Sequence, residues 1–291
     1  MSKFIIYGPG RLGTAFAIAL QTVGHDVLCA FAQDSRNESS LRFSHHTASP
    51  VYLVSEQAAM MREADAVLIT VPDKAVSVVA QTLMEHKALR AGQVVLHTAG
   101  VLDSSVLASL RSLGPAVGSL HPLQTFADPL LAARRLHGVY CSLEGDEAAV
   151  AFATRIVQDL GAVPVVIAPD LRPRYHAAAV LASNALVALA SVATDLLSFP
   201  QGLQALLPLM RGAMENLETI GLPGALTGPI ERGDKETIQV HLNALKDNPT
   251  ALHVYTALGH ATVEVAARKN SLTQAQQQAL ATLFAPRIDS Y

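Results

Sequence analysis

Residues 4–13 read Phe4-Ile5-Ile6-Tyr7-Gly8-Pro9-Gly10-Arg11-Leu12-Gly13, a short apolar run that leads into a glycine-rich loop. Apolar residues at helical spacing follow, and Gly24 then suits the end of a helix. In such a strand–loop–helix unit, the first glycine allows a tight turn, the second lets a pyrophosphate approach the backbone, and the third lets the helix pack on the strand. The helix N-terminus then faces the phosphates. The residues predicted to form this dinucleotide site are Gly8, Gly10, Arg11, Leu12 and Gly13.

Short apolar runs alternate with helical patterns through the first 170 residues. This alternation is typical of βαβ units and predicts an α/β fold with a Rossmann-type, mostly parallel sheet. After Asp170 the strand pattern stops, so we predict a dinucleotide-binding domain over residues 1–168 and an all-α domain for substrate binding or dimerisation over residues 169–291. We expect a hinge at Leu171–Arg174 and a polar surface loop at Ser39–Pro50. The expected strands are Phe4–Tyr7, Val27–Phe31, Ala66–Val71, Val94–His97, Ala116–Leu120, Val139–Leu143 and Val163–Ile167.

The composition narrows the class of protein. Half of the 291 residues are hydrophobic and only 15% are charged, which favours a large core over a disordered chain. A formal net charge of -3 leaves no basic excess for nucleic acid or anionic lipid, so a small-molecule substrate is the expected partner. Cys29 and Cys141 lie in apolar runs and are expected in the core, without a disulfide. No secretory signal precedes Gly8, which predicts a cytoplasmic location.

Ala177–Thr194 contains no charged residue and has the length of a short membrane span. Because the segment is rich in alanine and includes Ser183 and Asn184, we expect a buried central helix and no membrane partner. A long apolar helix in the second domain would also allow a homodimer.

The choice of dinucleotide depends on the residues after the second predicted strand, Gln33-Asp34-Ser35-Arg36. Ser35 and Arg36 would hold the 2′-phosphate of NADP by charge-assisted hydrogen bonds, with Arg11 nearby. Asp34 lies where NAD enzymes place an acid on the ribose, and it favours NAD instead. We expect NADP rather than NAD.

Two further strand ends lie at the predicted carboxyl edge of the sheet, where open α/β folds bind ligands. Thr70, Val71 and Pro72 follow one strand, and Thr98 and Ala99 follow the next. We expect these five residues to line the cofactor. Pro72 also suits a strand stop before a helix.

With these motifs, the chain resembles a family of NADP-binding oxidoreductases that join a Rossmann-like domain to a helical domain of unknown function. Members of this family are similar to ketopantoate reductase, pyrroline-5-carboxylate reductase, 3-hydroxyacid and 6-phosphogluconate dehydrogenases, and deazaflavin-dependent NADP reductases. The motifs that carry the resemblance are Gly8–Gly13, Gly118–Phe126, Tyr175–Ala178, Ser183–Asn184 and Ala225–Asp234.

The resemblance departs from its best-known members at one position. Hydroxyacid dehydrogenases and ketopantoate reductase place a general-acid lysine four residues before an asparagine. This chain keeps Asn184 but has Val180 at the lysine position. His176 lies two helical turns before Asn184 and would replace the lysine as proton donor.

Hydride transfer to a carbonyl or an imine needs a group that protonates the developing anion or amine, and histidine suits this role. His121 follows a predicted strand, and Pro122 stops that strand, so the imidazole should project toward a crevice between the domains. We predict that His121, His176 and Asn184 are catalytic; a turn histidine and a hinge cap are the alternative roles of the two histidines. His97 ends another strand and is a further candidate.

The remaining site predictions concern substrate binding. Asn184, an amide in an apolar helix, would bind substrate or nicotinamide, or else make a buried interhelical hydrogen bond. Arg232 would grip a carboxylate, or else pair with Asp234 or Glu231. We also assign Gln124 and Thr227 to the substrate. No HExxH or paired CxxC motif is present, so no metal is expected.

These observations predict an NADPH-dependent reductase of a small carbonyl or imine compound, with a ketopantoate-like 2-keto acid as the first substrate to consider. A protein similar to pyrroline-5-carboxylate reductase or to deazaflavin-dependent oxidoreductases is the alternative within enzymes. A sensor or scaffold that binds NADP without turnover is the alternative outside them, because the lysine is missing.

Overall fold

The computed structural model of the protein describes residues 1–53, 55 and 58–285. The chain divides into two compact units, Met1–Leu181 and Ala182–Tyr291, and each is described by itself. The first unit is α/β and the second is helical, as the sequence predicts.

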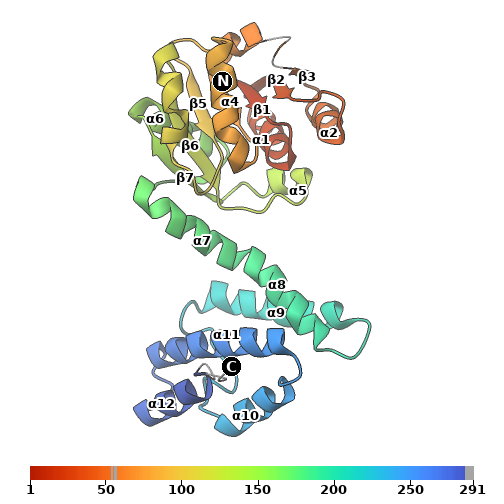
Figure 1. Ribbon diagram of the computed structural model, residues 1–291, viewed down its shortest axis with the longest axis vertical. Coiled ribbons are helices and arrows are strands. Elements are labelled where there is room, and N and C mark those ends of the chain that lie inside the picture. Colours follow the sequence, from red (N-terminus) through yellow and green to blue (C-terminus); the bar gives the residue numbers. More distant parts are fainter. Residues whose placement is uncertain (54, 56–57, 286–291) are drawn as a thin grey trace, which may run out of the picture. The chain divides into compact units, whose positions relative to one another are not determined.

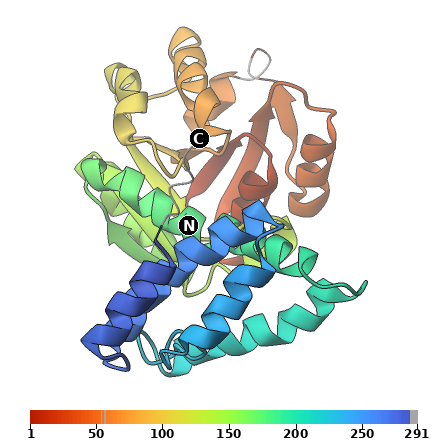
Figure 2. The same ribbon diagram turned by 60° about the horizontal axis from the view of Figure 1, so that its bottom comes forward.

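The first unit is built on one eight-stranded sheet in the order β3-β2-β1-β4-β5-β6-β7-β8 (Figures 1 and 2). The pairs from β3 to β6 are parallel, β7 runs antiparallel to β6, and β8 is parallel to β7. This is the Rossmann strand order with two added strands. The strands are β1 (Lys3–Tyr7), β2 (Asp26–Ala32), β3 (Val51–Leu53), β4 (Ala66–Ile69), β5 (Val94–His97), β6 (Ala116–Pro122), β7 (Tyr140–Gly145) and β8 (Val163–Val166).

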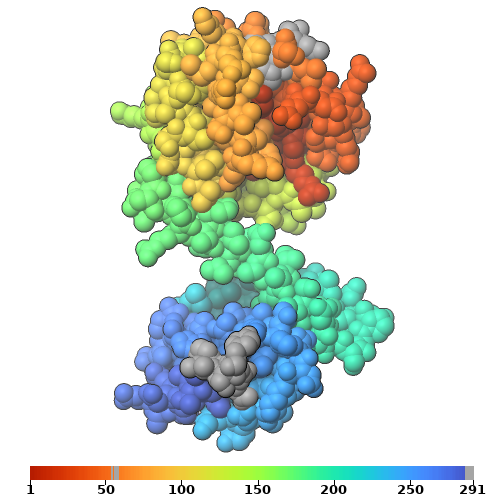
Figure 3. All heavy atoms as spheres, viewed as in Figure 1, coloured from red at the N-terminus to blue at the C-terminus, as the bar shows by residue number. Residues whose placement is uncertain are grey.

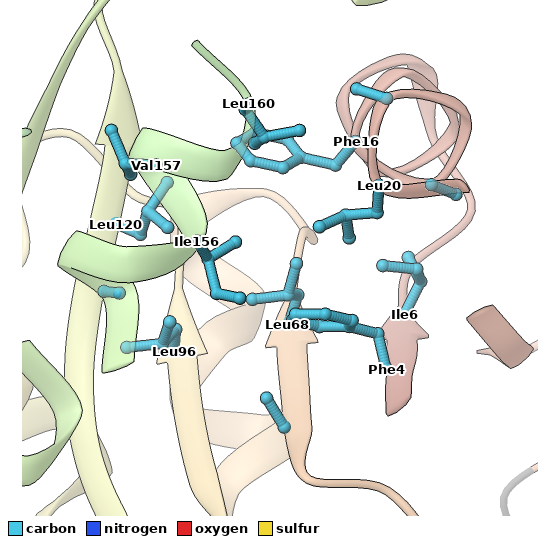
Figure 4. Packing of buried hydrophobic residues seen from close by; sticks show 14 of the residues in the cluster. Phe4, Ile6, Phe16, Leu20, Leu68, Leu96, Leu120, Ile156, Val157 and Leu160 are labelled. Carbon is cyan, nitrogen blue, oxygen red and sulfur yellow. The ribbon is translucent and has the colours of Figure 1, made fainter. Parts of the chain in front are cut away.

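Helices cover both faces of this sheet, and each face buries its own apolar cluster. On one face, α1 and α6 pack on the strands (Figure 4). On the other, α4, η1 and η2 do so, with Met61, Leu83 and Leu107 fully buried. Each large apolar side chain buried in this way contributes about 1.5–3 kcal/mol. The helices of the unit are α1 (Arg11–Thr22), α2 (Glu38–Thr47), η1 (Ala58–Glu63), α4 (Asp73–Glu85), η2 (Ser104–Leu113), α5 (Pro129–Arg134), α6 (Glu147–Asp159), η3 (Pro169–Leu171) and α7 (Arg172–Ala182).

The second unit packs its helices around a smaller apolar cluster that includes Ile238, Leu242, Leu280 and Phe284. Side-chain caps start three of its helices: Asp234 caps α10, Asn248 caps α11, and Thr273 forms a capping box on α12. Its helices are α8 (Asn184–Asp195), α9 (Gly202–Thr219), α10 (Lys235–Ala244), α11 (Pro249–Arg268) and α12 (Gln274–Leu283).

The predicted surface loop over Ser39–Pro50 is wrong, because most of it forms α2. Asn37 caps the helix by accepting a hydrogen bond from the Ser40 N–H group at 2.9 Å. Phe43 is fully buried on its inner face. One buried aromatic residue and a good cap therefore outweigh the polar composition of the segment.

The predicted buried central helix is also wrong. Pro169–Asp195 is long and apolar enough to cross a membrane by length and composition alone. An 18-residue window within it has a mean hydropathy of 1.8, and none of that window is buried within the protein. Its helical path is interrupted at Ser183, and Leu181 and Val187 are 71% and 72% exposed. The α8 part of this segment contacts α9 and α11, yet these helices leave apolar side chains such as Leu186 and Val187 exposed.

The predicted hinge at Leu171–Arg174 lies inside the first unit. Arg172 is fully buried, and its guanidinium is hydrogen-bonded to Ala99 and Ser119. The division between the units therefore falls after Leu181, later than the boundary expected after residue 168.

Candidate active site

The glycine loop that follows β1 is held by close backbone approaches. Gly8 has a φ of 105°, a conformation that favours glycine. A Cβ atom at Gly8 would lie 2.7 Å from Val71 Cγ1. A Cβ atom at Gly13 would lie 2.5 Å from Thr70 Oγ1 and 2.9 Å from Ile6 Cγ2. The first and third glycines therefore allow the turn and the close packing of helix on strand.

Gly10, the second glycine, faces open space: no neighbouring atom lies within 4 Å of the position of a Cβ atom. Helix α1 begins at the next residue, Arg11, and no side chain caps its N-terminus. Free N–H groups and the positive end of the helix dipole attract an anion at such a place. The red N-terminal segment lies in a recess between the orange segments of α2 and α4 (Figure 3). This arrangement suits a phosphate group.

The residues after β2 form a tight polar turn. Asp34 Oδ1 accepts a hydrogen bond from the Arg36 N–H group at 2.8 Å, so one oxygen of this acid stabilises the turn. Ser35 is half-buried and the Arg36 side chain is exposed. Within the described part of the chain, no ion pair engages the Arg36 guanidinium. The guanidinium of Arg36, which would favour NADP, is thus available to a ligand. One oxygen of Asp34, which would favour NAD, already accepts a hydrogen bond within the turn.

The ends of β4 and β5 support the glycine loop through their backbones and hydroxyl groups. Thr70 Oγ1 donates a hydrogen bond to the Gly8 carbonyl oxygen at 2.6 Å. The Thr98 N–H group donates to the Ile69 carbonyl oxygen at 3.1 Å. Val71 contacts the Gly8 turn, and Pro72 precedes α4. Thr70, Val71, Pro72 and Thr98 therefore lie together at the carboxyl edge of the sheet, beside the glycine loop. Ala99, the fifth predicted residue, is buried.

His97, at the end of β5, is fully buried and has both ring nitrogens in use. Its Nδ1 accepts a hydrogen bond from the Ala99 N–H group at 3.2 Å, and its Nε2 lies 3.1 Å from the Asp103 carbonyl oxygen. Burial lowers the pKa of His97 to about 4. We assign His97 a structural role in shaping the strand end.

His121, near the end of β6, is one of three aromatic side chains that the fold brings together. Its Nδ1 lies 3.2 Å from the hydroxyl of Tyr175, and the two rings are edge-on with centroids 5.6 Å apart. The ring of His176 is 5.8 Å from that of His121. Tyr175 and His176 both belong to α7, so the two histidines predicted to be catalytic are neighbours within the first unit.

Gly100 is the point on which both histidines pack. A Cβ atom there would lie 2.9 Å from His121 Nε2 and 2.9 Å from His176 Cε1, with His176 Nδ1 closer still. His176 Nδ1 is buried and has no hydrogen-bond partner among the described residues. Only glycine leaves room for this pair, and the sequence offered no sign of it beyond the position of Gly100 after a strand end.

Arg172 is the site residue that sequence reasoning missed. Its two terminal nitrogens donate hydrogen bonds of 2.7 Å to Ser119 Oγ on β6 and to the Ala99 carbonyl oxygen after β5. Burial lowers the pKa of its guanidinium. The sequence predicted a hinge at Leu171–Arg174, and only the partners of Arg172 that are distant along the chain reveal its buried role.

The pKa of His121 lies below the near-neutral value that the sequence analysis expected of a catalytic histidine. Burial, followed by the charges of His176 and Arg172, lowers the pKa of His121 to about 4. Burial also raises the pKa of Tyr175. At neutral pH His121 is therefore uncharged and can donate or accept a hydrogen bond.

Three predicted site residues lie in the second unit. Asn184 is exposed at the start of α8, and its Oδ1 accepts a hydrogen bond from Ser183 Oγ at 3.0 Å. The amide is therefore not in a buried interhelical bond. Thr227 and Arg232 are exposed in the loop before α10.

That loop is ordered by partners other than Arg232. Lys269 Nζ lies 3.1 Å from Glu231 and donates to the Leu226 carbonyl oxygen at 2.7 Å. Asp234 accepts from Thr237. Neither acid thus makes an ion pair with Arg232 in the described chain.

Gln124 lies in the first unit, just after β6, and its side-chain oxygen accepts a hydrogen bond from the Thr125 N–H group at 2.8 Å. Its amide nitrogen remains available for a ligand. Among the described residues, no group of three or more histidine, cysteine or acidic side chains is arranged to hold a metal ion.

The two parts of the chain match two family profiles. Residues 2–122 match a Rossmann-like domain, and residues 139–262 match a domain of unknown function, DUF2520. The class of protein is therefore a Rossmann-like domain followed by this second domain. The resemblance drawn from the sequence motifs is confirmed at this level. No protein of curated function matches the sequence.

Solved structures with the same fold extend over nearly the whole chain. A Bacteroides fragilis protein described as a candidate NADP oxidoreductase is 23% identical, with 90% of this chain and 97% of that chain covered and a TM-score of 0.72. A Thermotoga maritima protein is 24% identical, with 92% and 99% covered and a TM-score of 0.70. Pyrroline carboxylate reductase from Plasmodium falciparum with NADP bound is 11% identical, with 98% of each chain covered and a TM-score of 0.55. At these identities the similarity establishes the fold.

The low pKa values of His97 and His121 predict a loss of stability on mild acidification. Both histidines have a pKa of about 4 in the folded protein, below the usual value of about 6.5 in an unfolded chain. As the pH falls from about 6.5 to 4, the unfolded chain binds protons that the folded chain does not, so the free energy of unfolding should decrease. Urea unfolding at several pH values measures this decrease.

An NMR titration of the imidazole C2–H signals identifies the groups responsible. The signals of His97 and His121 should keep their neutral positions down to about pH 5. A midpoint near 6.5 for either residue would contradict the assignment.

Proposed function

We propose that this protein is an NADP(H)-dependent reductase of a small carbonyl or imine compound. The observation that carries the proposal combines two features within one unit: an open glycine at an uncapped helix N-terminus and a half-buried imidazole pair at the same carboxyl edge of the sheet. Open α/β folds bind their ligands at this edge. The first feature suits a dinucleotide and the second suits proton transfer.

The pyrophosphate would lie over Gly10 and the N-terminus of α1, where Arg11 and Leu12 begin the helix. The bound dinucleotide would supply a hydride to the substrate carbon. His121 and His176 would hold the substrate heteroatom and the proton that it needs. Gly100 keeps these two imidazoles in contact range of each other.

Both 2-keto acids and cyclic imines fit the proposed site as substrates. Both a ketopantoate-like acid and a pyrroline carboxylate carry a carboxylate, which a free arginine such as Arg232 binds in bidentate fashion. The similarity in fold to a pyrroline carboxylate reductase with NADP bound supports including imines. Asn184, Gln124 and Thr227 are proposed as further substrate ligands.

Turnover is the direct test of the reductase proposal. NADPH consumption should be detected with at least one member of a panel of 2-keto acids and cyclic imines. Gly100→Ala should lower kcat at least tenfold, because the added methyl group displaces both imidazoles. Gly212→Ala, on α9 with open space around it, is the matched control and should keep full activity. NADPH binding without any turnover would favour the sensor or scaffold alternative.

The preference for NADP is tested separately from turnover. Arg36→Ala should weaken NADPH binding by about 10-fold or more, because it removes a charge-assisted hydrogen bond of about 1.5–3 kcal/mol to the 2′-phosphate. NADH binding should change little. Isothermal titration measures both affinities, and equal losses for the two nucleotides would end the NADP assignment.

A second copy of the chain is the partner that we propose for the exposed apolar segment around α8. Leu181, Val187 and Leu209 are each more than two-thirds exposed. Large apolar side chains that stay exposed together commonly mark an interface, and these three are the observation behind the proposal. Sedimentation equilibrium should give twice the chain mass of 30.7 kDa. A monomer at micromolar concentration would exclude the homodimer.

A further inference from the structure

Three side chains from the first turns of α7 contact residues at the ends of β5 and β6. Arg172, Tyr175 and His176 are at positions i, i+3 and i+4, which lie on one face of a helix. Arg172 bonds to Ala99 and Ser119, and His176 packs on Gly100. Tyr175 is the member of this group that the proposed function leaves without a task.

The hydroxyl of Tyr175 lies near two polar atoms of His121. It lies 3.2 Å from the ring Nδ1 and 3.5 Å from the carbonyl oxygen of the same residue. The shorter contact is within the usual range of a hydrogen bond and the longer one is at its limit. If the hydroxyl donates to Nδ1, the proton of the neutral imidazole resides on Nε2. His121 Nε2 is the nitrogen that faces Gly100.

We propose that Tyr175 is a positioning residue that fixes His121 as the Nε2–H tautomer and replaces the proton that His121 gives to the substrate. This inference rests on the proposed reductase function for its second half. Its first half, the tautomer, stands on the contact between the two side chains alone.

The proposed reduction transfers one hydride and one proton to the substrate. A hydride adds to the substrate carbon, and the electron pair of the C=O or C=N bond moves to the heteroatom. The heteroatom forms a bond to the proton that leaves His121 Nε2, while Nδ1 takes the proton of the Tyr175 hydroxyl. A proton from water then reaches Nε2 of His121 while Nδ1 returns its proton to the tyrosinate, which restores the starting tautomer. The substrate is reduced by two electrons and NADPH becomes NADP⁺.

The surroundings of the pair favour this route over a charged histidine. The pKa of His121 is lowered to about 4 by burial and by the nearby charges of His176, Arg172 and His97. A neutral imidazole can give up its Nε2 proton only if Nδ1 gains one at the same time. Burial raises the pKa of Tyr175, whereas a hydrogen bond with Ser142 and the charge of Arg172 act in the opposite direction and favour the transient tyrosinate.

The chain contains a matched control pair outside this site. In the second unit, His241 Nδ1 lies 2.8 Å from the hydroxyl of Tyr255, and the rings are edge-on with centroids 5.7 Å apart. The contact has the same chemistry as that of His121 with Tyr175. It has no part in the proposed reaction.

The first experiment measures the tautomers directly in the unmodified protein. Imidazole ¹⁵N NMR at pH 7 should show His121 protonated on Nε2. In Tyr175→Phe, which keeps the ring but loses the hydroxyl, the His121 signals should move toward a mixture of tautomers. Tyr255→Phe should alter the His241 signals only. An Nδ1–H tautomer of His121 in the unmodified protein would overturn the proposal, whether or not any substrate is reduced.

The second experiment uses a substrate found in the turnover panel. Tyr175→Phe should lower kcat by about 10- to 100-fold, with KM within about twofold, since general acid–base groups contribute about 10²–10⁴. Its kcat should also lose the dependence on pH seen in the unmodified enzyme. Tyr255→Phe should keep kcat and the pH profile. An unchanged kcat in Tyr175→Phe would exclude the relay even if the tautomer is as expected. Absence of turnover in the unmodified protein would count against the reductase function, and the NMR result would still decide the tautomer.

Discussion

The two hydrogen bonds from Arg172 to Ser119 and to the Ala99 carbonyl oxygen are the constraint on which the candidate site depends. They tie the start of α7 to the ends of β5 and β6, and Tyr175 and His176 follow within one helical turn. Because the guanidinium is fully buried, losing either partner would leave a desolvated polar group at a cost of about 1–3 kcal/mol. The anchor therefore places the proton-bearing side chains and fixes a permanent charge beside them.

The parts of the structure that depend on local pattern could be predicted from sequence. The glycine loop, the strand order implied by βαβ alternation, and His121 at a strand end all follow from residues adjacent in the chain. Arg172 and Gly100 could not be predicted in this way, since their partners are distant along the chain. For α2, one buried phenylalanine outweighs a polar composition. For the apolar segment around Ser183, composition gives no information about which surface covers it.

The glycine loop and the imidazole cluster make different demands on the fold. The loop needs backbone approach only, so Gly8 and Gly13 are fixed by contacts with Val71 and Thr70 while Gly10 stays open. The imidazole pair of His121 and His176 needs side chains at defined orientations from β6 and α7, with the backbone of Gly100 after β5 between them. This difference explains why a dinucleotide site is easier to recognise than the reaction performed beside it.

Lowering the pKa of a histidine changes the chemistry that it can perform. A histidine that titrates near neutral pH stores a proton as a cation and can release it unaided. His121, buried beside Arg172 and His176, cannot hold that charge near neutral pH. A proton can leave such a ring only when another arrives, so the group bonded to its second nitrogen becomes part of the reaction. In this fold that group is the hydroxyl of Tyr175, on the helix that Arg172 anchors, so the proposed reduction does not depend on a lysine at the position of Val180.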